Sequence, residues 1–448
     1  MNAKHCRMVA LVLGAAFSTI VGAQSTDLQS KSVRLPITIR VPRGAHEFVN
    51  TQKLRAAAPV QRAESSDDDL NIATQSYNGT YSANTLPFWT FNIKGSRDRD
   101  HHLGVMVGHD PFRNPGTDQI PTYVVPLVIR THMVATAYDP TTGYYTTAPG
   151  ETTINPTQDD NNCLSSPNNN PIELLQQSPI FNPAEFVFGG VNVGKTQYVD
   201  AFQRANFWKV LGSNADSYHV LLGPVKTLAP VFLDVPPASG LALTDPNLFK
   251  AAYGFTYCAP LVLVDINWFD SYLTGTVIPA LAKAGVSPST LPIFTTYNTA
   301  WPVGDVTFIG NCCAGGYHGS TGVPIVDQTY AVVLFDTTGW FAGPPTGLST
   351  EVISHEVGEW MNDPFGANET APWGFTGQVA ACQANLEVGD PLTGNDVAPV
   401  TMPNGFTYPL QELAFFSWFY GGPSVGANGW YSNNDTFTTD AGPICPAK

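Results

Sequence analysis

The stretch from residue 351 to residue 362 constrains the fold most strongly, because it combines helical character with apolar residues on nearly every side. Its apolar positions include Val352, Ile353, Val357 and Trp360. A helix that is apolar almost all round is buried in a protein, so His355, Glu356 and Glu359 would be buried with it. Buried ionisable groups need partners or a metal ion. The stretch therefore predicts a buried polar site rather than a surface helix that carries these residues by chance.

The spacing of the three ionisable residues is typical of a metal-binding helix. Positions four apart lie on one helical face, so His355 and Glu359 can bind a single cation, while Glu356 can reach a water bound to it. This is the arrangement of the HExxH metallopeptidases, with Glu359 in the place of the second histidine. Carboxylate oxygen is an ordinary zinc ligand. The pattern predicts one zinc ion, and the extra negative charge leaves another divalent metal as an alternative.

The neighbouring residues indicate a strand, a loop and then the helix. Residues 329–335 form a β-rich run, and residues 346–350 offer hydroxyl groups that can cap the helix. Pro364 disfavours helical geometry before it, so the helix should end near Met361 or Asn362. We expect an α+β, zincin-like fold with a mixed β-sheet, in which this strand lies beside the helix.

A zinc site needs a third protein ligand and an open position for water. Glu387 and Asp390 are the candidates, and Glu387 lies 28 residues beyond Glu359, which is enough for a loop to return to the helix. On a helical turn both side chains could face the metal, whereas in a strand they would point to opposite sides. Glu387 is preferred because its side chain is longer, with Asp390 as a substitute or as a partner of the ligands.

The run SHEVGEWMNDP, followed by Trp373 and then LEVGDP, resembles a group of secreted zincin-like proteins. In that group an SHExxE-x(3)-DP helix precedes a tryptophan and an E-[IV]-[GA]-D segment. Residues 316–320 are similar to its Gly-Tyr-His-[SG] segment, which also resembles plant phosphate-induced (exordium-type) secreted proteins that lack the metal helix. Gln411 and residues 415–419 resemble the closing segment. The resemblance covers about residues 261–445 and implies that Glu387 is the third ligand.

His318 lies among glycines, which let the backbone come close to a ligand. We expect it to stabilise the tetrahedral intermediate or to bind a substrate carbonyl, and a structural histidine is an equal alternative. Calcium is a second candidate cofactor, with Asp159, Asp160 and Asp363 as candidate ligands for a structural ion.

The first 23 residues predict export. Lys4, His5 and Arg7 form a basic region, residues 8–21 are apolar, and small residues precede Gln24, as in a cleaved signal peptide. The apolar run is short for a membrane span, and no later run approaches the required length. The expected location is extracellular or periplasmic.

Removal of residues 1–23 leaves six of the seven cysteines, an even number that favours disulfides in an exported chain. They are Cys163, Cys258, Cys312, Cys313, Cys382 and Cys445. Cys312 and Cys313 are adjacent, so we expect each to pair with a different partner. A zinc ion bound by cysteines is an alternative that lacks the usual CxxC spacing.

Composition and length define the remaining expectations. The formal charge of −15 becomes −17 once Lys4 and Arg7 are removed, which argues against a nucleic-acid partner. Residues 24–85 contain an acidic run and are expected to be a linker, or alternatively a propeptide that masks the site. Residues 86–255 are β-rich, and residues 256–448 hold the candidate metal ligands. The sequence carries no signal for an oligomeric state.

Together these features predict a secreted metallopeptidase that acts on a protein or peptide substrate. Glu356 would serve as general base, taking a proton from a metal-bound water and passing it to the leaving amine. The alternative is a non-catalytic secreted binding module of the same fold, in which the metal is structural or absent.

Overall fold

A computed structural model of the chain describes residues 72–75, 85–164, 169–253, 256–321, 327–338, 350–374, 382–442 and 445. The expected signal peptide and nearly all of the expected linker or propeptide lie outside these residues. Within the described ranges, no helix has the length and apolar character that a membrane crossing requires.

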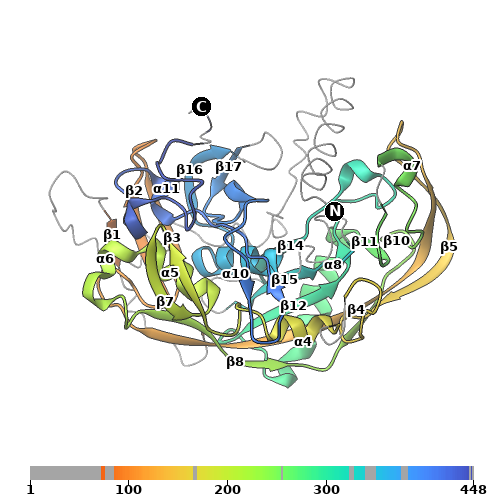
Figure 1. The fold of residues 1–448 in the computed structure, drawn as a ribbon, viewed down its shortest axis with the longest axis horizontal. Helices are drawn as coiled ribbons and strands as arrows, with labels where there is room; N and C mark the ends of the chain where they lie inside the picture. Colours follow the sequence, from red (N-terminus) through yellow and green to blue (C-terminus); the bar gives the residue numbers. More distant parts are fainter. Residues whose placement is uncertain are drawn as a thin grey trace.

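A ten-stranded mixed sheet organises the described chain (Figure 1). Its longest strand, β4 (Thr117–Tyr138), pairs in parallel with β12 (Leu291–Tyr297), which pairs in parallel with β15 (Thr329–Phe335). β14 (Gly316–Ser320) runs antiparallel to β15 at the end of this path. β12 and β15 are buried along their whole length, as expected for apolar strands that are covered on both faces.

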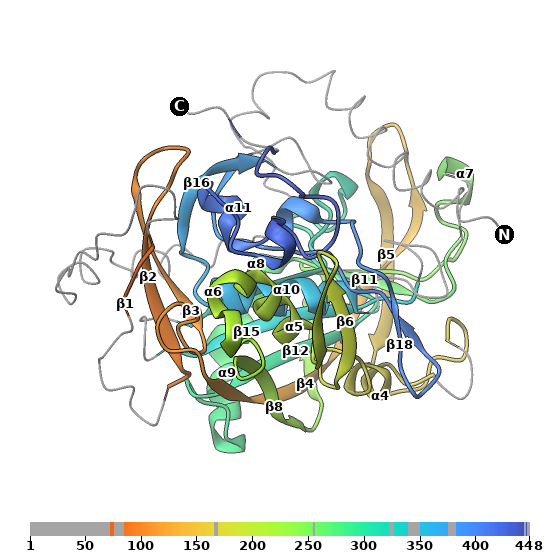
Figure 2. The ribbon, with the colours of Figure 1, turned by 60° about the vertical axis from the view of Figure 1, so that its left-hand side comes forward.

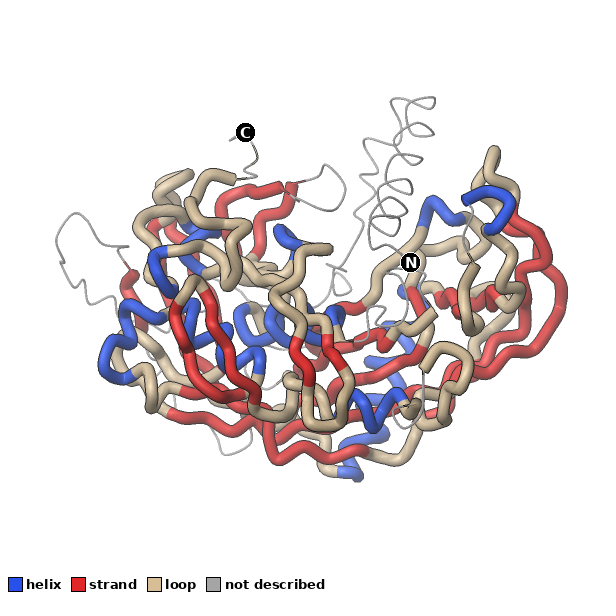
Figure 3. Tube along the Cα trace, viewed as in Figure 1, coloured by secondary structure: helices blue, strands red, loops and turns tan. Residues whose placement is uncertain are grey.

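The sheet takes strands from both sides of residue 255. The remaining strands are β5 (Tyr145–Ile154), β8 (His219–Thr227), β9 (Val231–Asp234), β10 (Gly240–Leu243), β11 (Leu261–Val264) and β13 (Thr299–Ala300). The parts expected at 86–255 and 256–448 therefore share one sheet. The described chain is α+β and mostly sheet, which confirms this part of the fold prediction (Figure 3).

Small sheets and short helices surround the central sheet (Figures 1 and 2). The additional strands are β1 (Ile72–Gln75), β2 (Phe88–Lys94), β3 (His101–Val107), β6 (Ala184–Phe188), β7 (Val191–Thr196), β16 (Glu369–Gly374), β17 (Cys382–Asn385), β18 (Val400–Thr401) and β19 (Thr407–Tyr408). Besides α10 (Glu351–Asn362), the α-helices among the described residues are α4 (Pro171–Gln176), α5 (Tyr198–Asn206), α6 (Trp208–Leu211), α7 (Lys250–Tyr253), α8 (Ile266–Tyr272), α9 (Ile278–Leu281) and α11 (Phe416–Tyr420).

The helix α10 (Glu351–Asn362) is buried over its whole length, as its apolar residues predict. It packs against β14 and β15, and also contacts β3 and α5. The indole Nε1 of Trp360 donates a 2.9 Å hydrogen bond to Thr329 Oγ1 on β15. The predicted helix end and the predicted strand beside the helix are both confirmed. The Thr350 hydroxyl does not cap the helix, because it donates to the backbone oxygen of Pro409 at 2.6 Å.

The disulfides correct one prediction. Cys163 pairs with Cys258 across a sequence separation of 95 residues. Cys312 and Cys313 pair with each other, so the expectation that they have different partners is wrong. The peptide bond between these two cysteines is cis, a geometry that the prediction did not consider.

Candidate metal centre

α10 carries three ionisable side chains into the interior of the protein. His355 is 1% exposed, and Glu356 and Glu359 are fully buried. His355 Nε2 lies 3.1 Å from Glu359 Oε1, one turn along the helix, as their spacing predicts. Among the described residues, no hydrogen-bond donor contacts either oxygen of Glu356 or Glu359 Oε2. Burying polar atoms without hydrogen-bond partners costs folding free energy unless a donor or a positive charge interacts with them.

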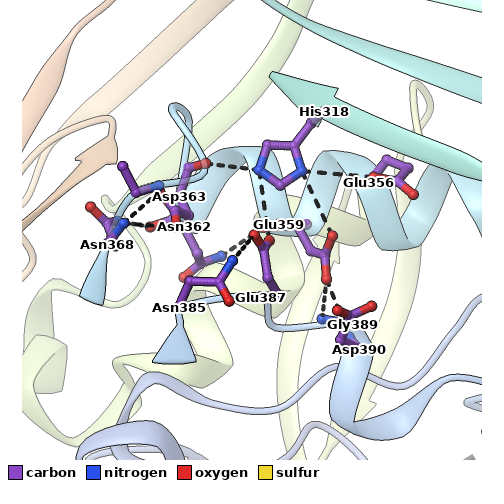
Figure 4. A network of polar contacts seen from close by, with 12 residues as sticks. His318, Glu356, Glu359, Asn362, Asp363, Asn368, Asn385, Glu387, Gly389 and Asp390 are labelled. Carbon is purple, nitrogen blue, oxygen red and sulfur yellow. Dashed lines mark hydrogen bonds and ion pairs between the residues drawn. The ribbon is translucent and has the colours of Figure 1, made fainter. Parts of the chain in front are cut away.

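The loop that follows β17 approaches the same point of α10 (Figure 4). The backbone N–H groups of Gly389 and Asp390 donate to Glu359 Oε1 at 3.1 and 3.2 Å. Asp390 Oδ1 lies 3.5 Å from His355 Nε2. A Cβ atom at position 389 would be 2.5 Å from His355 Nδ1. Glycine is therefore required where the loop passes the imidazole ring.

His318 reaches the cluster from β14, above the helix in the view of Figure 4. Its Nε2 lies 2.9 Å from the backbone oxygen of Asp363. A carbonyl oxygen can only accept, so Nε2 carries the hydrogen, and the lone pair of the neutral ring is on Nδ1. Nδ1 lies 3.7 Å from both Glu356 Oε2 and Glu359 Oε2. The lone pair of His318 thus belongs to the same group of donor atoms.

Gln411 orients the other histidine. Its side-chain Nε2 donates to the backbone oxygen of Gly389 at 2.7 Å, which leaves Oε1 as the acceptor for His355 Nδ1 at 2.9 Å. In the neutral ring of His355, the lone pair is therefore on Nε2, which faces Glu359. Histidines that bind metals usually donate their other ring N–H to an oxygen in this manner. Both histidines of the cluster have such a partner.

The structure brings together the predicted base, His318 and the candidate zinc ligands in one cluster. Two sets of three residues offer donor atoms within 4.8 Å of one another. One set is His318, Glu359 and Glu387, and the other is His355, Glu356 and Glu359. Glu387 was expected beside His355, but its Oε2 lies 3.7 Å from His318 Nε2. Asp390 is the acidic residue of the loop that lies beside His355. The two candidates for third ligand therefore lie near different histidines.

Several residues that support the cluster were not identified as site residues from the sequence. Asn385 Nδ2 donates to Glu387 Oε1 at 2.5 Å, and Gln383 donates to the carboxylate of Asp390. Gln411 was noted only through the resemblance of its segment. Neutral amides form no charge pattern or ligand spacing, so the sequence offers no further signal for them.

Burial and mutual repulsion shift the pKa values of the cluster. Burial raises the pKa of Glu356 and that of Glu387 well above the usual range. Neighbouring carboxylates raise both pKa values further, and His355 partly offsets the shift of Glu356. Burial also raises the pKa of Glu359, to about 7, although His355 partly offsets the effect. Burial lowers the pKa of His355, but Glu359 and Asp390 outweigh it and hold that pKa well above its usual value. The cluster therefore attracts positive charge.

The donor set fits a divalent cation. In the described residues, Glu356, Glu359 and Glu387 lie within 4 Å of histidine nitrogens, and no ion pair joins them to lysine or arginine. Imidazole nitrogen together with carboxylate oxygen is a common ligand set for zinc. The buried oxygens without donors and the two oriented lone pairs provide the ligands that such an ion requires.

The aspartates predicted to bind calcium are engaged by hydrogen-bond donors. Asp160 accepts from the backbone N–H of Asn162 and from the hydroxyl of Tyr297. Asp363 accepts from the backbone N–H of Asn368 through both carboxylate oxygens. Asp159 accepts from the side-chain amide of Asn170 at 3.1 Å. None of the three aspartates belongs to a group with metal-ligand spacing in the described parts of the chain.

The protein without bound metal should become less stable as the pH rises from about 4.5 to 7. The pKa of Glu359 is raised from 4.5 to about 7 in the folded state, so the folded state binds this proton more tightly than the unfolded state. The resulting stabilisation is present below pH 4.5 and lost as the pH rises through 7. It amounts to about 3 kcal/mol for this group. Urea unfolding at several pH values measures this change in the free energy of unfolding. If the stability of Glu359→Gln depends on pH as strongly as that of the wild type, Glu359 is not the group responsible.

Gly316→Ala should displace Glu356. A Cβ atom at this position of β14 would lie 2.7 Å from Glu356 Oε1 and 2.6 Å from Val352 Cγ1. If Glu356 is the general base that the sequence predicts, a displacement of about 1 Å should lower peptide turnover roughly 100-fold. Bound metal should remain, because the added methyl group is directed at Glu356 rather than at His355. Peptide turnover and metal content test this, with Gly275→Ala as the control because its Cβ meets nothing within 4 Å. Equal activity of the two variants would contradict the expectation.

Comparisons with protein-family models, with curated proteins and with solved structures found no match to this chain.

Proposed function

We propose that this chain is an exported, metal-dependent peptidase that hydrolyses peptide bonds. The observation that carries the proposal is the buried cluster in which His355 Nε2, both oxygens of Glu356 and Glu359 Oε2 have no hydrogen-bond partner among the described residues. The resemblance of the helix and of the LEVGDP segment to secreted zincin-like proteins supports the same function. The Cys163–Cys258 disulfide and the signal-like first 23 residues support export.

His355, Glu359 and Asp390 are the residues that would hold the catalytic cation. His355 Nε2 lies 3.1 Å from Glu359 Oε1 and 3.5 Å from Asp390 Oδ1. Ligands around a tetrahedral zinc ion lie roughly 3.3 Å apart, given metal–ligand distances of about 2.0–2.1 Å. The cation would act as a Lewis acid toward the peptide carbonyl and make a water more acidic.

Glu356 would move the proton during hydrolysis. It follows His355 on the helix, both of its oxygens lack donors, and burial raises its pKa well above the usual range. A carboxylate with a raised pKa can accept a proton from the attacking water near neutral pH and return it to the leaving amine. His318 Nδ1, 3.7 Å from Glu356 Oε2, would limit the positions that this carboxylate can take.

A non-catalytic binding module is the second candidate, and the burial of the cluster favours it. Structural zinc sites are closed, whereas catalytic sites keep a position open for water. His355 is 1% exposed and Glu356 and Glu359 are 0% exposed, so the cluster is enclosed in this structure. In such a module the cation would stabilise the packing of α10 against the loop after β17.

Metal content and peptide turnover of the purified exported protein distinguish the two candidates. The peptidase should contain tightly bound metal, cleave casein or a mixed peptide library, lose activity with a chelator and regain it when zinc is returned. Tightly bound metal without turnover would favour the binding module. Protein that is folded, free of metal and unable to bind added zinc would overturn the peptidase and leave only a binding module without a metal.

A further inference from the structure

The carboxylate of Glu359 lies between the two histidines of the cluster. Its Oε1 lies 3.1 Å from His355 Nε2, and its Oε2 lies 3.7 Å from His318 Nδ1. These two ring nitrogens are the ones that carry lone pairs in the neutral histidines, because each partner nitrogen donates to an oxygen. A carboxylate placed in this way can give one oxygen to each of two cations.

We infer that the cluster binds two divalent cations side by side, with Glu359 bridging them. This inference rests on the proposal that the cluster binds a cation at all. The first position is the one described above, next to His355 and Asp390. The second position lies next to His318, Glu359 and Glu387, whose donor atoms are within 4.8 Å of one another.

Glu387 provides independent support for the second position. It is 2% exposed, its Oε1 accepts from Asn385, and its Oε2 has no hydrogen-bond donor among the described residues. Oε2 lies 3.7 Å from His318 Nε2, the ring nitrogen that donates to Asp363. A carboxylate oxygen that is buried without a donor is stable as an anion only when a positive charge compensates it. The first cation position, beside His355 and Asp390, does not use this oxygen.

The charge of the cluster leads to the same conclusion. The two histidines are approached by four acidic side chains: Glu356, Glu359, Glu387 and Asp390. With neutral histidines, one divalent cation would balance half of the four negative charges, and two would balance all of them. Hydrolytic enzymes with two metal ions hold them about 3.5–4 Å apart and use both on the attacking and leaving groups. A bridging carboxylate is consistent with that separation.

Metal stoichiometry tests the inference. Chelated protein should be titrated with Zn²⁺ by calorimetry, and its metal content should be measured after dialysis. We expect two equivalents in the wild type and in the control Glu185→Gln, which removes the same charge from an exposed site on β6. Glu387→Gln should retain one equivalent. Two Mn²⁺ ions that share a carboxylate also interact magnetically, so the Mn²⁺-loaded wild type should give the spin-coupled EPR spectrum of a pair.

The possible outcomes separate this inference from the proposed function. One equivalent in the wild type, with the EPR spectrum of an isolated Mn²⁺ ion, would overturn the second position and leave the peptidase proposal standing. One equivalent that is lost in Glu387→Gln would place a single cation beside His318 and would also overturn the pair. No bound metal would overturn both proposals. The EPR measurement uses the wild type, so it does not depend on the folding of any variant.

Discussion

Glu356→Gln should lower peptide turnover by about 10²–10⁴-fold, the usual contribution of a general base, and leave the bound metal in place. Glutamine has nearly the shape of glutamate but cannot accept the proton of the attacking water. Glu356 lies beside the proposed ligands His355 and Glu359 but is not assigned as one itself. Steady-state cleavage of a fluorogenic peptide, with the metal content of the same sample, measures both effects.

Two further variants make this result specific. His355→Ala should lose both metal and turnover, because it removes an imidazole ligand. Glu185→Gln should retain both, because this glutamate is exposed on β6 and far along the chain from the cluster. Equal loss of metal in Glu356→Gln and His355→Ala would show that Glu356 is a ligand and would contradict its assignment as the general base.

Removal of the Cys163–Cys258 disulfide should lower the free energy of unfolding by roughly 4–5 kcal/mol. The bond closes a loop with a sequence separation of 95 residues, and so restricts the unfolded chain strongly. Urea unfolding of the double alanine variant, compared with the oxidised wild type, gives the difference.

The second disulfide is a natural control for this measurement. Cys312 and Cys313 have a sequence separation of one residue, so their bond closes no long loop in the unfolded chain. Replacing both with alanine should therefore change the stability far less. If the two double variants are destabilised equally, loop closure does not explain the contribution of the Cys163–Cys258 bond.

The helix and the strand beside it were predictable because short stretches of sequence encode them. The apolar residues around α10 require burial, and Pro364 requires an end at about Asn362, where the helix does end. The contact between His355 and Glu359 follows from the pitch of the helix alone. Each of these features depends on residues close together in the chain.

The features that were missed or mistaken depend on residues that meet only in the folded protein. The Thr350 hydroxyl donates to Pro409 rather than to the helix, which no local rule anticipates. Glu387 and Asp390 are three residues apart, yet the path of the loop places them near different histidines. The role of Gln411 likewise requires both Gly389 and His355 to be in position.

The two hydrogen bonds of the Gln411 side chain limit how early the cluster can form as the protein is made. This residue joins the loop at Gly389 to the ring of His355, and it lies 56 residues beyond that histidine in the chain. A nascent chain that ends before Gln411 carries the complete helical motif but lacks the group that orients its imidazole. Contacts between such distant residues form late in folding. The proposed cation should therefore bind tightly only after the chain has been synthesised beyond Gln411 and this residue has docked against Gly389 and His355.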